Sequence, residues 1–177
     1  YIGFGSMVSG DMGELAEIIR QAVKLSGVRA VVALGWGQQE AKTKDTNIFY
    51  VKSVPHDWLF PHMAGAVHHG GAGTTATSLR HALPTLVVPF GGDQPFWAER
   101  VYAAGCGPKA IPRDKLTEEN LAEGLRALIS NPEYTRNAAC IGEALRNEHG
   151  CANAADLIEK AVWDWENGNP AQDGMNI

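Results

Sequence analysis

A glycine-rich loop that ends in two hydroxyl residues carries the strongest chemical signal, Val67-His-His-Gly-Gly-Ala-Gly-Thr-Thr75. Glycines permit close approach of the backbone to a ligand, and the amides at the start of a helix attract an anion. The loop has neither the G-K-[ST] ending of a Walker A motif nor the G-x-G-x-x-G spacing of a dinucleotide site. We therefore expect a phosphate-binding loop of another type; a turn that serves only strand-to-helix packing is the alternative. The candidate ligands are His69, Gly70, Gly71, Gly73, Thr74 and Thr75.

A second loop, Pro89-Phe-Gly-Gly-Asp-Gln-Pro-Phe-Trp97, again has paired glycines after an apolar run. Asp93 and Gln94 together offer two acceptors and an amide donor pair, which suits the neighbouring hydroxyls of a sugar. An aspartate in this position also serves as an ordinary helix N-cap. Both interpretations stay open from the residues alone.

A third loop, Lys52-Ser-Val-Pro-His-Asp-Trp58, follows a further apolar run. Its proline fixes an extended backbone whose amide and carbonyl groups suit the edge of a flat base, and His56 can pack beside that base. Trp58 either stacks on the base or belongs to the core, and the core is favoured. His68 is expected to be a buried histidine with its hydrogen bonds satisfied.

Several kinds of chemistry have no residues to support them in this chain. It has no Asp-x-Asp pair to hold a divalent metal on a diphosphate, so we expect no metal and no cofactor. It has no Gly-x-Ser-x-Gly elbow and no evident catalytic base. We therefore expect the reaction to need residues outside this chain.

Length and charge narrow the class of protein. The 177 residues suit one domain, and the net charge of −5 disfavours nucleic acid as a partner. No apolar run approaches the roughly 18 residues that suggest a transmembrane segment. The 3 cysteines form no C-x-x-C pair, which favours a reducing, cytoplasmic location. Residues 1–6 resemble a strand entering a glycine turn, so we expect a domain cut from a longer protein.

Apolar periodicity indicates which elements position these loops. A one-sided apolar stripe predicts a helix over 12–26, capped by Asp11, and short apolar runs predict strands over 28–34, 47–51, 64–68 and 84–88. Helical patterns follow Thr74, Gln94 and the cap residue Thr117, and a last helix carries the stripe Leu157, Ile158, Ala161, Val162 and Trp165. This alternation predicts an α/β fold, a Rossmann-like parallel sheet with helices on both faces. We expect one domain over 1–167 and a disordered tail over 168–177.

The three loops, in this order and spacing, resemble the donor-binding half of family 1 UDP-glycosyltransferases, and sterol 3β-glucosyltransferases most of all. The resemblance implies the C-terminal half of a GT-B fold, with an N-terminal acceptor domain that this chain lacks. Ser53, Thr77 and His56 depart from the plant small-molecule enzymes, which have Trp, Glu and Gln at these positions.

The resemblance also implies roles for single residues. Ser6 would lie near the diphosphate, Val54 would contact uracil through its backbone beside His56, and His69 would bind a phosphate oxygen. The remaining implied ligands are Gly71, Gly73, Thr74 and Thr75 for the diphosphate, and Asp93 and Gln94 for the sugar.

The implied reaction transfers glucose from UDP-glucose to a sterol 3β-hydroxyl with inversion, and the base lies on the missing domain. The isolated domain would bind UDP-sugar and be inactive in transfer. Peripheral attachment of the full-length protein to a membrane stays open. One alternative is a bacterial transferase for a polyketide or glycopeptide aglycone. A second is a stand-alone nucleotide-sugar-binding module that docks on a partner subunit.

Overall fold

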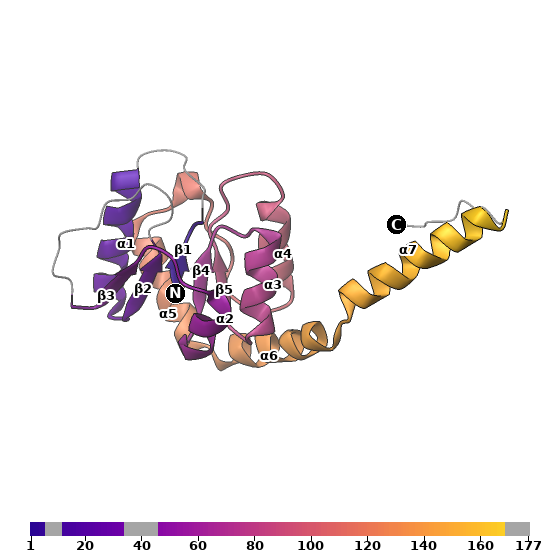
Figure 1. Ribbon diagram of the computed structural model, residues 1–177. Helices are drawn as coiled ribbons and strands as arrows, with labels where there is room; N and C mark the ends of the chain where they lie inside the picture. The colour runs from indigo at the N-terminus through magenta and orange to yellow at the C-terminus, as the bar shows by residue number, and fades with distance from the viewer. Residues whose placement is uncertain (6–11, 34–45, 169–177) are drawn as a thin grey trace. The chain divides into compact units, whose positions relative to one another are not determined.

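Five parallel strands form one sheet in the computed structural model, which describes residues 1–5, 12–33 and 46–168 (Figure 1). They are β1 (Ile2–Gly3), β2 (Ala30–Ala33), β3 (Ile48–Val51), β4 (Ala66–His68) and β5 (Thr85–Val87), in the spatial order β3-β2-β1-β4-β5. Each lies within or beside an apolar run that predicted it. The continuous apolar character of these runs fits strands that are covered on both faces.

The last residues of the five strands pair with one another in a single row. Gly3 is in register with Ala33 on one side and His68 on the other, Ala33 with Val51, and His68 with Val87. All the loops that follow the strands therefore leave from the same edge of the sheet. Because β1 lies between β2 and β4, the chain reverses its direction of winding at β1 and β4, where α/β folds bind ligands.

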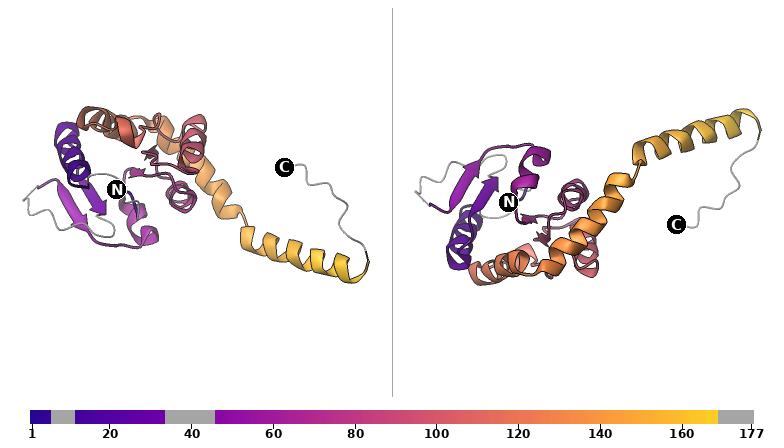
Figure 2. Two further views of the ribbon diagram at one scale, coloured as in Figure 1. Left: turned by 90° about the horizontal axis from the view of Figure 1, so that it is seen from above. Right: turned by 90° about the horizontal axis from the view of Figure 1, so that it is seen from below.

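Helices cover both faces of the sheet, as predicted (Figure 2). α1 (Met12–Ser26) and α5 (Glu118–Ser130) pack on each other and on one face, whereas α3 (Ala72–Arg80), α4 (Gln94–Ala103) and α6 (Pro132–Asn147) cover the other. On β5, Leu86 joins the first core and Val87 the second. The remaining short elements are α2 (His56–Leu59), η1 (Phe60–His62) and η2 (Arg113–Lys115).

Local sequence determines where α1 and α5 begin and end. The predicted bounds of the first helix, 12–26, are those observed, although its expected cap, Asp11, lies outside the described residues. At α5, the Thr117 side chain accepts the Asn120 amide and the Asn120 side chain accepts the Thr117 amide, a complete capping box. The cap predicted from Thr117 is thus confirmed.

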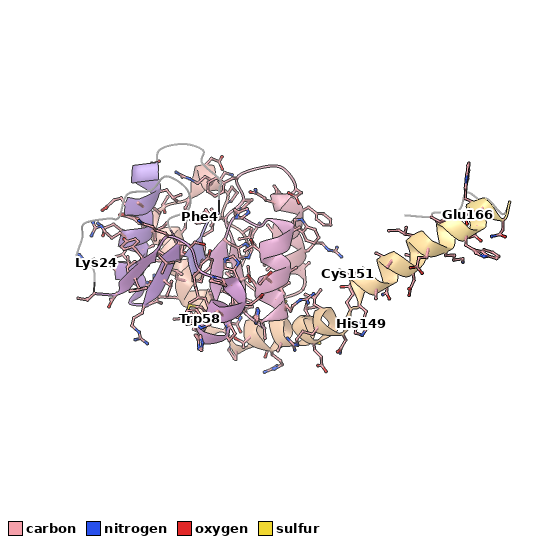
Figure 3. The ribbon with its side chains drawn as sticks, in the orientation of Figure 1. Phe4, Lys24, Trp58, His149, Cys151 and Glu166 are labelled. Atoms are coloured by element: carbon pink, nitrogen blue, oxygen red, sulfur yellow. The ribbon has the colours of Figure 1, made fainter. Side chains whose placement is uncertain are left out.

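The chain divides into two compact units, Tyr1–Leu145 and Arg146–Ile177. Helix α7 (Gly150–Glu166) belongs to the second unit, and Figure 3 labels Cys151 and Glu166 near its two ends. None of its residues is buried, and the predicted stripe is confirmed as helical but lies exposed. The predicted tail lies outside the described residues from 169 onward. No helix in the described part of the chain has the length and apolar character needed to cross a membrane.

Candidate functional site

The loop between β4 and α3 places the first turn of α3 at the carboxyl edge of the sheet. Gly71 is the N-cap of α3 in an extended conformation, and the first helical bond runs from the Thr75 amide to the Gly71 carbonyl at 2.9 Å. The amides of the first turn before Thr75 have no acceptor inside the helix. Together with the positive end of the helix dipole, they can bind an anion.

Two contacts hold this loop in shape. The Gly70 amide donates to Nδ1 of His68 at 3.0 Å, and Gly70 has φ +91°, which favours glycine. A Cβ on Gly70 would lie 2.6 Å from Val87 Cγ1 and 3.2 Å from the Gln94 carbonyl oxygen. Gly70 is therefore required both by its backbone angle and by the closeness of β5 and α4. His68 is buried as predicted, and its Nδ1 accepts one hydrogen bond, but the described residues show no partner for its Nε2.

His69 lies where the chain changes its direction of winding. A Cβ on Gly5, just after β1, would be 3.3 Å from His69 Cε1, and one on Gly71 would be 2.6 Å from His69 Nε2. The ring thus bridges the loop after β1 and the start of α3. Burial lowers the pKa of His69, although the nearby Asp93 carboxylate opposes that shift. Its buried Nδ1 has no hydrogen-bond partner in the described residues.

The hydroxyl residues of α3 differ in what they can offer. Thr75 is buried, and its Oγ1 has no partner in the part of the chain described. Thr77 donates its hydroxyl to the Gly73 carbonyl at 2.9 Å, so it is engaged within the helix. Gly73 itself is exposed, and a Cβ there would meet no atom of the described residues within 4 Å. Among these residues, the first turn of α3 is therefore uncovered at Gly73.

The second glycine-rich loop brings Asp93 and Gln94 to the same edge, at the start of α4. Gln94 is buried, and its Oε1 accepts the amides of Phe90 at 2.7 Å and Gly91 at 3.2 Å. Asp93 occupies the N-cap position but makes no side-chain cap bond; its Oδ2 accepts the Trp97 indole N–H at 2.8 Å. The capping alternative for Asp93 is thus wrong. One oxygen of each side chain is already engaged.

The third loop places Val54 and His56 after β3. Val54 is half-buried against the small core around Phe60, and the His56 ring stacks on Phe60 with centroids 4.5 Å apart. His56 Nε2 also lies 3.1 Å from the Tyr1 hydroxyl, and burial lowers the pKa of this imidazole. Trp58, labelled in Figure 3, is 65% exposed, so the favoured assignment to the core is wrong. Its position in α2 turns the ring outward while Leu59 is buried.

The described residues do not test two of the sequence predictions for the site. Ser6 lies outside them. Within residues 1–5, 12–33 and 46–168, no three His, Cys, Asp or Glu side chains gather as metal ligands, and metal independence stays a prediction.

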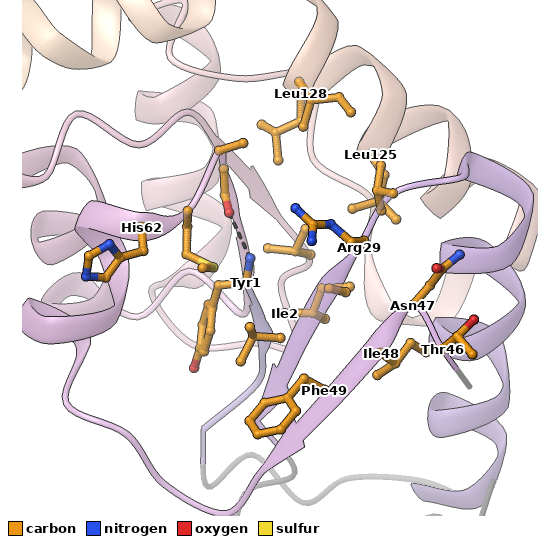
Figure 4. A pocket seen from close by; sticks show the side chains of 18 residues that line it. Tyr1, Ile2, Arg29, Thr46, Asn47, Ile48, Phe49, His62, Leu125 and Leu128 are labelled. Carbon is orange, nitrogen blue, oxygen red and sulfur yellow. Dashed lines mark hydrogen bonds between the residues drawn. The ribbon is translucent and has the colours of Figure 1, made fainter. Parts of the chain in front are cut away.

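A pocket of about 640 Å³ that the sequence did not indicate opens at the other edge of the sheet (Figure 4). Ile2, Ala30 and Ile48, the first residues of β1, β2 and β3, line it together with Arg29 and Leu128. None of the predicted site residues lines this pocket. The loops at the carboxyl edge are therefore a separate feature of the fold.

A family model described as "Erythromycin biosynthesis protein CIII-like, C-terminal domain" matches residues 17–159. The chain belongs to this family. This membership confirms the resemblance to family 1 glycosyltransferases that the three loops predicted. The match runs from within α1 to within α7 and includes all three loops.

Curated relatives of this EryCIII-like domain are sterol 3-beta-glucosyltransferases. One from Arabidopsis thaliana is 43% identical over 162 residues, which are 90% of this chain and 26% of that protein. One from Kluyveromyces lactis is 42% identical over 166 residues, or 89% of this chain and 14% of that protein. The chain thus spans about a quarter or less of the length of these relatives.

Solved structures share the fold of the EryCIII-like domain. The glycosyltransferase VinC in complex with dTDP has a TM-score of 0.68 and 27% identity, and the match covers 82% of this chain and 37% of VinC. The calicheamicin glycosyltransferase CalG4 has a TM-score of 0.76 at 20% identity, covering 91% of this chain and 42% of CalG4. The predicted fold, the C-terminal half of a GT-B glycosyltransferase, is confirmed.

Proposed function

We propose that this chain is the donor-binding part of an inverting glycosyltransferase, and that it binds UDP-glucose at the carboxyl edge of its sheet. The diphosphate would lie between His69 and the first turn of α3, the sugar at Asp93 and Gln94, and uracil at the Val54 backbone beside His56. Ser6, Gly71, Gly73, Thr74 and Thr75 would complete the diphosphate site. We further propose that the whole protein carries out a hexosyl transfer that needs no metal and no cofactor.

One observation carries the proposal: His69 spans the point where the winding reverses, with a buried nitrogen that has no described partner. A buried polar atom without a described partner supports a ligand at this point. The first-turn amides of α3 lie next to it through Gly71. A diphosphate would accept hydrogen bonds from both groups.

The chemistry that follows is stabilisation of the leaving group. When the glycosidic bond to the diphosphate breaks, negative charge develops on a phosphate oxygen, and preorganised donors there lower the barrier. His69 and the α3 amides would supply those donors in place of a metal ion. The base that deprotonates the acceptor hydroxyl would come from residues outside this chain.

The proposed acceptor is the 3β-hydroxyl of a sterol. The relatives at 43% and 42% identity are named for this reaction, whereas VinC is 27% identical. A sterol therefore has more support as the acceptor than a natural-product aglycone has. Because sterols reside in bilayers, we propose that the complete cytoplasmic enzyme works peripherally at a membrane surface.

Titration calorimetry of the 177-residue chain tests the donor site. UDP should bind more tightly than ADP or dTDP, with the same affinity in EDTA. Absence of heat and of a thermal shift with UDP at millimolar concentration would reject the proposal. An affinity that disappears in EDTA would reject its metal-free form, and preference for dTDP would favour a natural-product enzyme.

His69→Ala is the residue-level test. It should weaken UDP binding, and in a complete enzyme it should lower kcat by about 100- to 1000-fold, as removal of one charge-stabilising donor does elsewhere. His62→Ala is a matched control, because His62 is exposed and lines the pocket at the opposite edge. Equal UDP affinity in the two variants would count against the assignment of His69.

A further inference from the structure

The two residues proposed to hold the sugar are each partly occupied by the protein itself. Gln94 Oε1 is engaged by the amides of Phe90 and Gly91. Asp93 Oδ2 is engaged by the indole N–H of Trp97. The polar atoms left for a ligand are Oδ1 of Asp93 and Nε2 of Gln94, for which the described residues show no hydrogen bond.

Trp97 is in a position to fix the Asp93 carboxylate. It is half-buried on the first turns of α4, and its ring meets that of Phe96 edge to face with centroids 5.2 Å apart. The Trp97 amide also donates to the Asp93 carbonyl at 3.3 Å, so backbone and side chain of the two residues are both joined. Asp93 has helical backbone angles, φ −81° and ψ −6°, and its side chain caps no amide of α4. Among the described residues, Trp97 is therefore the residue whose side chain donates a hydrogen bond to the Asp93 carboxylate.

We propose that Trp97 is a positioning residue of the sugar subsite, which presents one acceptor and one donor to a sugar: Asp93 Oδ1 and Gln94 Nε2. This inference rests on the proposed function and adds the orientation of the sugar ligands. A sugar hydroxyl would donate to Asp93 Oδ1, and the same or an adjacent hydroxyl would accept from Gln94 Nε2. Trp97 touches no substrate and acts through Asp93.

The consequence is a selective loss when the indole N–H is removed. Trp97→Phe keeps an aromatic ring beside Phe96 but leaves the Asp93 carboxylate free to rotate. Ordering that side chain during binding would then lower affinity for the sugar by about three- to tenfold. In this arrangement UDP is held by His69, the first turn of α3 and the loop after β3, and Asp93 serves the sugar, so UDP affinity should stay unchanged.

The test measures the ratio of UDP-glucose affinity to UDP affinity by calorimetry on the full 177-residue chain. We expect Trp97→Phe to lower this ratio by about three- to tenfold, and to change it by less than about twofold when Asp93 is already replaced by alanine. Trp163→Phe is the matched control, since it removes a 58% exposed indole from α7. It should leave the ratio unchanged.

A second readout does not depend on ligand. The Trp97 indole N–H resonance should move in Asp93→Ala and stay in place in Asp57→Ala, which removes an exposed carboxylate elsewhere. The inference would be overturned if Trp97→Phe kept the wild-type ratio of UDP-glucose to UDP affinity. It would also be overturned if Trp97→Phe lowered this ratio as much in the Asp93→Ala background as in the wild type, while UDP still bound. Failure of the wild-type chain to bind UDP would instead reject the proposed function, and this inference with it.

Discussion

The backbone N–H of Gly70 donates to Nδ1 of His68 over 3.0 Å in the interior of the protein. Because Nδ1 accepts this bond, the neutral ring carries its proton on Nε2. Burial, together with the neighbouring His69 and His56, lowers the pKa of His68 to about 3. A protonated ring would lose its bond to Gly70 and leave a charge in the core. The shape of the loop between β4 and α3 thus depends on an uncharged His68.

This pairing predicts a pH dependence of stability. An unfolded chain binds a proton at His68 below the ordinary histidine pKa of 6.5, whereas the folded chain does so only near pH 3. The contribution of His68 to the free energy of unfolding is therefore fully present above pH 6.5 and is lost as the pH falls toward 3. The slope from this one proton is at most about 1.4 kcal/mol per pH unit. Urea unfolding between neutral pH and about pH 4 measures it.

Two variants separate His68 from the carboxylates that titrate in the same range. His68→Asn does not titrate and keeps an acceptor oxygen near the Gly70 amide, so its stability should fall less steeply with acid. His62→Asn, at an exposed position, should keep the wild-type slope. A slope in His68→Asn equal to that of the wild type would contradict the assignment.

Gly70→Ala should disrupt both fold and binding. The new methyl group would lie 2.6 Å from Val87 Cγ1, at a φ of +91°. Strain of this kind costs about 1–3 kcal/mol, before any displacement of β5 or α4 is counted. We expect a lower midpoint of urea unfolding and loss of UDP binding. Unchanged stability would show that the close approach of the loop to β5 is not as described.

Gly73→Ala should separate binding from stability. The added methyl group meets no described residue within 4 Å and lies in the first turn of α3, where alanine favours the helix by about 0.5 kcal/mol over glycine. The same open space is where we place the diphosphate. We therefore expect a slightly more stable protein with weaker UDP binding, measured by unfolding and calorimetry on the same sample. A variant that gains stability and keeps its UDP affinity would remove Gly73 from the site.

Elements that depend on local sequence were predicted well. The apolar stripe of α1 placed the helix at 12–26, and Thr117 marked the start of α5, because periodicity and capping are properties of neighbouring residues. The parallel sheet followed from continuous apolar strands that alternate with helices. The three loops lie at one edge because parallel strands end on the same side.

Properties that arise between distant segments were not predictable. Trp58 lies in an apolar run that is typical of a core, yet α2 turns it outward. The apolar stripe of α7 predicted a helix, but it did not predict that the stripe is exposed. The pocket lies where the first residues of β1, β2 and β3 come close to α5. These residues are far apart in the sequence, so no short motif indicates the pocket. The bonds of Gln94 and Asp93 depend on side-chain rotamers, which residue types alone leave open.

Replacement of Gln94 tests which atoms the sugar contacts. Gln94→Glu keeps an oxygen for the Phe90 and Gly91 amides, and the positive end of the α4 dipole favours its charge. It loses the Nε2 donor, so we expect a stable protein that binds UDP normally and no longer favours UDP-glucose over UDP. Gln94→Met loses the acceptor as well, leaves two amides unpaired, and should cost about 1–3 kcal/mol of stability.

The comparison of these two variants decides between a structural and a ligand-binding role for Gln94. If Gln94 serves only to brace the loop through Oε1, Gln94→Glu will keep the wild-type ratio of UDP-glucose to UDP affinity, and only Gln94→Met will change it. If Nε2 contacts the sugar, both variants will lose the ratio while only Gln94→Met loses stability. Calorimetry and urea unfolding on both proteins distinguish these results, because Oε1 accepts from two described amides, whereas Nε2 donates to no acceptor among the described residues.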